Sequence, residues 1–180
     1  MASSTPPCHC APGEEKVQRG RVDGLAIRPW VARLSGTIDD ERVDETITAL
    51  AKKLKLKPGA RAAVVGAPTG YVETLGTPDG STVGRELVGP LDWVQVFVRT
   101  SAELAAILPA LTAALDPNAL VWLSYPKGSS KIQTNLTRDR GWEPLEGSNL
   151  MWISLVSIDA TWSAFSVRPY KPGEKRQTFR

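Results

Sequence analysis

The polar segment from Lys127 to Arg140 carries the residue types best suited to hold a small anion. It opens with Lys-Gly-Ser-Ser-Lys, which offers ammonium groups, hydroxyls and backbone amides to a phosphate or a carboxylate. The run is not a Walker loop, because the spaced glycine and the Gly-Lys-Ser order are missing. The candidate ligand-binding residues are Lys127, Ser129, Ser130, Lys131, Asn135, Arg138 and Asp139. A solvated loop is the commoner meaning of such a stretch and stays open as the alternative.

Nucleophilic or metal-dependent catalysis finds little support in the residue types. The only histidine, His9, stands between Cys8 and Cys10, so no imidazole base is available for a serine such as Ser163. The Cys-His-Cys triplet is a poor zinc site, because consecutive side chains of an extended chain alternate in direction and structural zinc uses four spaced ligands. Asp159 is expected to cap a hairpin turn. We therefore predict no catalytic residue, no metal and no cofactor.

Length and charge narrow the class of protein. At roughly 100–200 residues per domain, a chain of 180 residues predicts one domain with extensions. The net charge is +3, and it lies in the last ten residues, where Lys171, Lys175, Arg176 and Arg180 outweigh Glu174. Because the excess is on a tail and not on a folded face, nucleic acid is not expected as the main partner. No apolar run reaches the ~18 residues of a membrane span, so we expect no membrane insertion. Cys8 and Cys10, one residue apart, are no disulfide framework, so a cytoplasmic protein is expected.

Composition divides the chain into four regions. Residues 1–22, rich in serine, proline and glycine, are predicted to be a disordered N-terminal tail. Residues 23–54 are predicted to be an arm followed by a helix, with Trp30 as the anchor of the arm. Residues 55–170 form the predicted α/β domain, and residues 171–180 a basic disordered tail.

Hydrophobic periodicity predicts the order of the elements. Helices are expected over residues 37–54, 71–75 and 101–115, and strands over 62–66, 82–88, 93–98 and 120–125. Thr100 and Glu103 form a capping box, and Pro109 predicts a kink or an exposed break near Ala105. The last two apolar runs, 150–158 and 162–167, are joined by three residues and must therefore pair antiparallel. The fold class predicted is α/β, an open, mostly parallel sheet with a C-terminal antiparallel strand pair.

Several segments resemble a known family. They are Leu56-Lys57-Pro58-Gly59, Val64-Val65-Gly66-Ala67-Pro68, Tyr125-Pro126-Lys127-Gly128-Ser129-Ser130, Leu136-Thr137-Arg138-Asp139-Arg140-Gly141-Trp142 and Ile158-Asp159-Ala160-Thr161-Trp162-Ser163-Ala164. The stretch 55–169 resembles an uncharacterised bacterial domain-of-unknown-function family with a shortened class I methyltransferase-like, Rossmann-like core. The resemblance implies the fold and no established activity.

The same resemblance implies that the S-adenosylmethionine site is lost. Methyltransferases carry a glycine-rich loop after the first strand and an acid after the second. Here the loop 66–70 has two glycines with a proline between them, and Glu86 is the one conceivable ribose acid, although a surface glutamate is the simpler interpretation.

The hypothesis favoured by these observations is a non-catalytic binding or accessory module that mediates protein–protein interaction or self-association. Trp30 and Trp142 are its candidate partner-binding residues, because both lie outside the predicted strands. A second hypothesis is a small-molecule enzyme or sensor that binds an anionic ligand, bearing phosphate or carboxylate, at the carboxyl edge of the sheet. A third is weak nucleic-acid association through the basic C-terminal tail.

Overall fold

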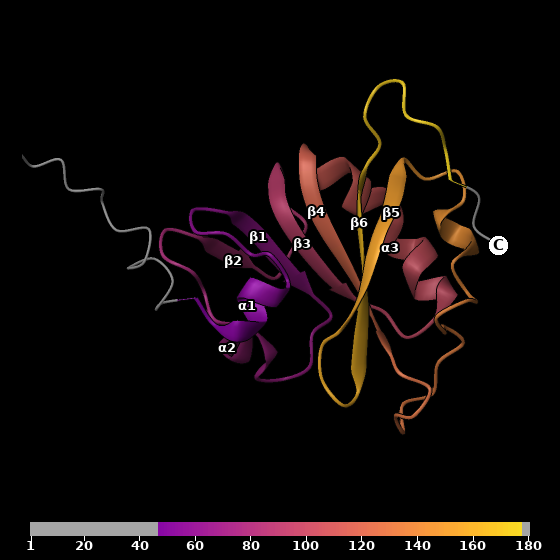
Figure 1. The fold of residues 1–180 in the computed structure, drawn as a ribbon, viewed down its shortest axis with the longest axis horizontal. Helices are drawn as coiled ribbons and strands as arrows, with labels where there is room; N and C mark the ends of the chain where they lie inside the picture. The colour runs from indigo at the N-terminus through magenta and orange to yellow at the C-terminus, as the bar shows by residue number, and fades with distance from the viewer. Residues whose placement is uncertain (1–46, 178–180) are drawn as a thin grey trace, which may run out of the picture. The chain divides into compact units, whose positions relative to one another are not determined.

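The computed structural model describes residues 47–177 of the chain (Figure 1). The elements are α1 (Ala49–Lys53), β1 (Arg61–Val65), α2 (Tyr71–Leu75), β2 (Thr82–Gly84), β3 (Leu91–Phe97), α3 (Ser101–Ala114), β4 (Leu115–Pro126), the 3-10 turn η1 (Glu143–Leu145), β5 (Leu150–Ser157) and β6 (Trp162–Pro169). They build one six-stranded sheet in the order β2-β1-β3-β4-β6-β5. The first four strands in this order are parallel, and β6 pairs antiparallel with both β4 and β5. The predicted fold class is confirmed.

Each face of the sheet has its own core. On one face α1 and α2 pack against apolar side chains that include Trp93, Phe97, Trp122 and Trp162. On the other face α3 and η1 pack against a second core that includes Leu104, Leu111, Leu145, Trp142 and Phe165. Because helices cover both faces, the central strands β3 and β4 are apolar on both sides, as parallel strands of α/β proteins are.

Two tryptophans fix α1 to the sheet. The indole N–H groups of Trp93 and Trp122 both donate to the carbonyl oxygen of Leu54, at 2.8 and 2.7 Å. Leu54 is the C-cap of α1, where a helix leaves carbonyl groups without intrahelical partners. Both buried indole N–H groups therefore have a hydrogen-bond acceptor, as those of buried tryptophans usually do.

The structure corrects the expected helix over 37–54. Thr48 has extended backbone angles, and its hydroxyl accepts a hydrogen bond from the Ala51 amide at 3.0 Å, so the described helix begins at Ala49. A threonine caps the N-terminal end of a helix in this way, because its hydroxyl accepts a hydrogen bond from a backbone N–H group that has no carbonyl partner within the helix. Residues 37–46 of the predicted helix, and the Cys8-His9-Cys10 triplet, lie outside the described residues.

The strand expected over 82–88 is shorter, since only Thr82–Gly84 pairs with β1. The helix α3 continues through Pro109. Proline has no N–H to donate to the carbonyl oxygen of Ala105, and Ala105 is exposed to solvent. Half of the predicted capping box is present, because the Thr100 hydroxyl accepts from the Glu103 amide. The Glu103 carboxylate accepts from the Arg99 amide, one residue before the N-cap Thr100.

An ion pair at the start of β1 and β3 makes the stability depend on pH. Arg61 donates to both oxygens of Asp92, at 2.9 and 2.7 Å, and these bonds lower the pKa of Asp92 to about 2. The folded pKa lies below the unfolded value, so the stabilisation is present above pH 4 and is lost as the pH falls toward 2. We expect Asp92→Asn to flatten the dependence of the urea midpoint on pH in this range. Asp79→Asn, at an exposed position, is the control, and an Asp92→Asn curve parallel to that of the wild type would contradict the prediction.

Candidate functional site

A crevice for ligands is expected between β1 and β3. From β1 the chain goes to β2 on one side and to β3 on the other, so the strand order reverses here. The helix α2 then lies on one face of the sheet and α3 on the opposite face. Open α/β sheets bind ligands outside the carboxyl ends of the strands at such a switch point.

Aromatic rings pack together at the carboxyl end of β3, next to this switch point. Phe97, the last residue of β3, makes edge-to-face contacts with Tyr71 and Trp162, with ring centroids 4.7 and 5.0 Å apart. The three residues, here named the aromatic plug, are 6%, 7% and 5% exposed. Gly66 adds to the closure, because a Cβ atom at this position would lie 2.8 Å from the Phe97 carbonyl oxygen. The β1–α2 loop therefore packs directly on the end of β3.

A buried chain of hydrogen bonds runs below the plug. The Tyr71 hydroxyl donates to Gln95 Oε1 at 3.0 Å, and Gln95 Nε2 donates to the Ser124 hydroxyl at 2.8 Å. Gln95 and Ser124 are fully buried. Burial raises the pKa of Tyr71 to about 12, so its phenol stays protonated near neutral pH. These groups satisfy one another and hold the plug in position.

A small cavity remains beside the β1–α2 loop. It measures about 260 Å³ and is lined by residues 66–73 together with Val64 and Arg85. Arg85 follows β2 directly, at the strand end where a ribose-binding acid is expected. Glu86 instead lines a separate groove with Arg61 and Pro90. The strand-end residue that lines the cavity is thus an arginine, and the acidic residue in its lining, Glu73, comes from α2.

The first residues of the predicted anion-binding set join the β5–β6 turn. Lys127 Nζ donates to the Ser157 hydroxyl at 2.7 Å and to the Asp159 carbonyl oxygen. The Asp159 carboxylate accepts from the Thr161 and Trp162 amides at 2.6 and 2.7 Å, which confirms its expected role as a turn cap. The ammonium group of Lys127 therefore ties its loop to the hairpin.

The next residues of the predicted anion-binding set differ in their surroundings, since one bonds to the start of α3 and others are exposed to solvent. Asn135 Oδ1 accepts from the Ser101 amide, and Asn135 Nδ2 donates to the Ser101 hydroxyl, both at 2.9 Å. Asn135 thus supports the first turn of α3. The Ser130 hydroxyl accepts from the Ile132 amide at 3.4 Å, whereas Ser129 and Lys131 are exposed on the loop.

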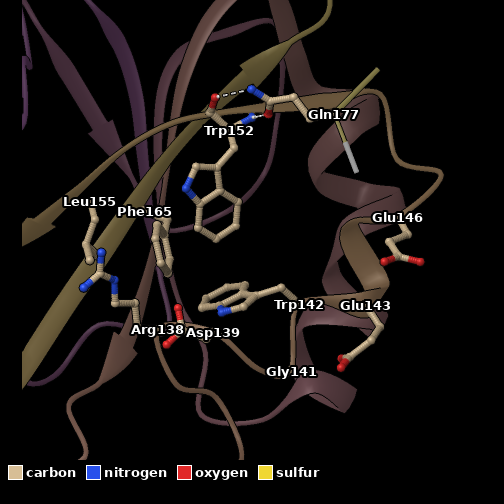
Figure 2. Close-up of a pocket in the computed structure, with 10 residues that line it drawn as sticks. All are labelled: Arg138, Asp139, Gly141, Trp142, Glu143, Glu146, Trp152, Leu155, Phe165 and Gln177. Atoms are coloured by element: carbon tan, nitrogen blue, oxygen red, sulfur yellow. Dashed lines mark hydrogen bonds between the residues drawn. The ribbon is translucent and has the colours of Figure 1, made fainter. Parts of the chain in front are cut away.

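The last two residues of the set, Arg138 and Asp139, lie at a groove beside β5 (Figure 2). The β5 groove, as we name it, measures about 610 Å³ and is lined by Arg138, Asp139, Gly141, Trp142, Glu143, Glu146, Trp152, Leu155, Phe165 and Gln177. Its apolar part is a packed aromatic group, in which Phe165 lies 5.0 Å from Trp142 and 3.7 Å from Trp152 between ring centroids. The seven predicted residues therefore do not form one site.

The candidate partner residue Trp142 belongs to this groove. It is 5% exposed, and its indole N–H donates to the Thr137 carbonyl oxygen at 2.7 Å. The other candidate, Trp30, lies outside the described residues. Figure 2 places the carboxylates of Glu143 and Glu146 on the η1 side and Arg138 with Asp139 on the opposite side. The exposed rim thus has three carboxylates and one guanidinium.

The first part of the expected disordered tail is folded back on the sheet. Arg168 donates to both carboxylate oxygens of Glu174, at 2.9 and 2.8 Å, and these bonds lower the pKa of Glu174 to about 2. The Gln177 amide then accepts from the Trp152 backbone N–H at 2.9 Å and donates to the Trp152 carbonyl at 3.3 Å. Residues 171–177 are therefore held in place, because their polar side chains find partners on β6 and β5.

Sequence reasoning did not single out Phe97 or Gln177 as site residues. A signal for Phe97 exists, since it ends an apolar strand immediately before a polar loop at the carboxyl edge. Gln177 carries none, because its amide acts on the main chain of a strand 25 residues away.

No family model matches the chain, and no curated protein matches it. Among solved structures, it is similar to a SAM-dependent methyltransferase from Aquifex aeolicus, at 14% identity and a TM-score of 0.50, over 72% of this chain and 93% of the other. The fold is methyltransferase-like. Weaker likenesses are to a ribosomal protein L11 methylase from Lactobacillus delbrueckii subsp. bulgaricus (11% identity, TM-score 0.46, 74% of this chain and 81% of the other) and to LepI in complex with SAM (13%, 0.42, 67% and 39%).

Within residues 47–177, no helix is both long and apolar enough to cross a membrane. The same residues hold no group of three or more His, Cys, Asp or Glu side chains arranged to bind a metal ion.

Proposed function

We propose that this protein is a non-catalytic binding module, built on a methyltransferase-like fold with a closed cofactor crevice, that mediates protein–protein interaction. The observation that carries the proposal is the aromatic plug, because Tyr71, Phe97 and Trp162 pack at the switch point where a ligand of this fold class would bind.

The residues around the crevice do not fit an adenosyl cofactor. The remaining cavity of about 260 Å³ is smaller than the ~300–1,000 Å³ of typical ligand pockets. Ribose hydroxyls are usually held by a carboxylate after the second strand, whereas Arg85 lines the cavity here and Glu86 lines another groove. The buried phenol of Tyr71, bonded to Gln95, is not available as a base.

The β5 groove supports the binding half of the proposal. It combines a floor of aromatic side chains with an exposed charged rim, a composition typical of protein-binding surfaces. Lys127, one of the candidate anion-binding residues, donates instead to the Ser157 hydroxyl and the Asp159 carbonyl oxygen.

A thermal-shift panel tests the proposal. We expect no change in melting temperature with S-adenosylmethionine or S-adenosylhomocysteine at millimolar concentration. A ligand selective for the native state, present at a hundred times its Kd, would add about 2.7 kcal/mol to the stability, which is easily measured. A rise with either adenosyl compound would overturn the proposal. A rise with inorganic phosphate or nucleotides that Lys127→Met abolishes would favour the anion-binding alternative.

A further inference from the structure

The two edges of the sheet differ in length and in chemistry. The edge at β2 is three residues long, whereas the edge at β5 is eight residues long, Leu150 to Ser157, without a single charged side chain or proline. A long uncharged edge strand is a template for pairing, because it presents a row of backbone N–H and C=O groups. Two of the exposed large hydrophobic residues, Ile153 and Leu155, lie on this strand, with 46% and 39% of their surface accessible.

The β5 groove lies alongside this edge. Leu155 is paired with Phe165 on β6, and Trp152 is paired with Val167, so Leu155 and Trp152 face the same side of the sheet as the aromatic floor. The register between β5 and β6 shifts between Trp152 and Ser154, so regular alternation is expected only for a strand that adds to residues 154–157, where every second side chain would lie on the face of the groove.

The C-terminal tail already forms hydrogen bonds to the backbone at the edge of β5. The Gln177 amide accepts from Trp152 N–H and donates to Trp152 C=O, so one side chain takes the place of one residue of a neighbouring strand (Figure 2). An incoming strand must displace Gln177 to pair with the backbone of Trp152. The tail therefore competes with any such partner.

Charge decides what kind of partner fits. Asp139, Glu143 and Glu146 outnumber Arg138 at the exposed rim, which favours a segment with arginine or lysine. A second copy of the chain, paired β5 to β5 about a two-fold axis, would bring two acidic rims to the same face of a continuous sheet. Like charges make that arrangement unfavourable.

We propose that β5 and the β5 groove bind an extended, basic segment of a partner protein, which adds to β5 as a strand and displaces Gln177. This inference rests on the proposed function, since it names the surface and the partner chemistry of the binding module.

The experiment uses a fluorescent synthetic peptide of alternating arginine and valine, titrated with the full chain and followed by anisotropy. Two control peptides replace arginine with glutamate or carry N-methyl groups on alternate amides. We expect only the unmodified basic peptide to bind. The double charge reversal Glu143→Lys, Glu146→Lys should weaken binding by about tenfold. Gln177→Ala should strengthen binding by about two- to fivefold, because its two competing hydrogen bonds to Trp152 are removed. Val88→Lys, an exposed apolar position beyond β2, is the matched control and should change nothing.

Each other outcome overturns the assignment. Binding that tolerates N-methylation excludes strand addition, and equal binding of the acidic peptide excludes recognition by charge. A dimer in light scattering that Leu155→Glu dissociates would assign the edge to a second copy of the chain. Absence of peptide binding, together with unchanged melting temperatures in the adenosyl panel, would overturn this surface while leaving the non-catalytic module in place. A melting-temperature rise with adenosyl compounds would instead overturn the proposed function itself.

Discussion

Replacing Phe97 with alanine is expected to lower the free energy of unfolding by about 3–5 kcal/mol, the usual cost of removing a buried aromatic ring. The ring is 6% exposed and is the common partner of Tyr71 and Trp162, so its removal leaves a cavity and ends both edge-to-face contacts. Urea denaturation at 25 °C, read as the midpoint at constant slope, measures the loss.

Two further variants serve as controls for the stability of Phe97→Ala. Phe97→Leu keeps most of the volume and should cost about 1–2 kcal/mol, because large hydrophobic substitutions that nearly conserve volume are tolerated. Val88→Ala, at a residue that is 71% exposed, should change the stability by less than about 0.5 kcal/mol. A loss below about 1 kcal/mol for Phe97→Ala would mean that the ring is not part of a packed core. The Phe97 ring would then be able to swing aside for a ligand.

Breaking the chain of hydrogen bonds at Gln95 is expected to cost about 2–4 kcal/mol, because Gln95→Met leaves the Tyr71 and Ser124 hydroxyls buried without their partner. Methionine has nearly the volume and flexibility of glutamine, so the loss reports hydrogen bonding and not a cavity. The free energy of unfolding from urea titration is again the measurement.

The matched variant for Gln95 removes all three polar groups together. Gln95→Met combined with Tyr71→Phe and Ser124→Ala should recover at least about 1 kcal/mol of the loss, since no donor or acceptor of the chain is then left unsatisfied. An equal or larger loss in the triple variant would show that the polar groups contribute by packing alone.

These two predictions are independent of the binding test at β5. Phe97 and Trp162 belong to the core on the α1 and α2 face, whereas Trp142 and Phe165 belong to the core on the α3 face. Substitutions without shared partners usually add in their effects. A peptide-binding defect from Glu143→Lys, Glu146→Lys can therefore be separated from a loss of stability at the plug.

The order of strands and helices in residues 47–177 was largely predictable. The helix α3 follows from its Thr100–Glu103 capping box and its apolar face, and the β5–β6 hairpin follows from a three-residue join with Asp159 as its cap. The start of α1 was not predictable by period alone, because the apolar spacing continues through Thr48, which caps the helix instead.

The candidate site was harder to predict. Residues between Lys127 and Asp139 are contiguous in the chain and share one chemistry, so a sequence pattern groups them together. In the folded protein their partners differ, because Lys127 bonds to the β5–β6 turn, Asn135 bonds to Ser101, and Arg138 lines the β5 groove. Side-chain direction, set by these partners, divides the group.

By itself, the sequence determined the order of the strands and helices, the α/β class and the antiparallel pair at the end of the sheet, because periodicity, caps and turn residues act over a few positions. Only the tertiary structure decided that the Tyr71 hydroxyl bonds to the buried Gln95 and that the tail bonds to the edge of β5. Those contacts join Tyr71 to Gln95 and Gln177 to Trp152 across 24 and 25 residues. No local rule relates such positions, since the packing of the whole sheet brings them together.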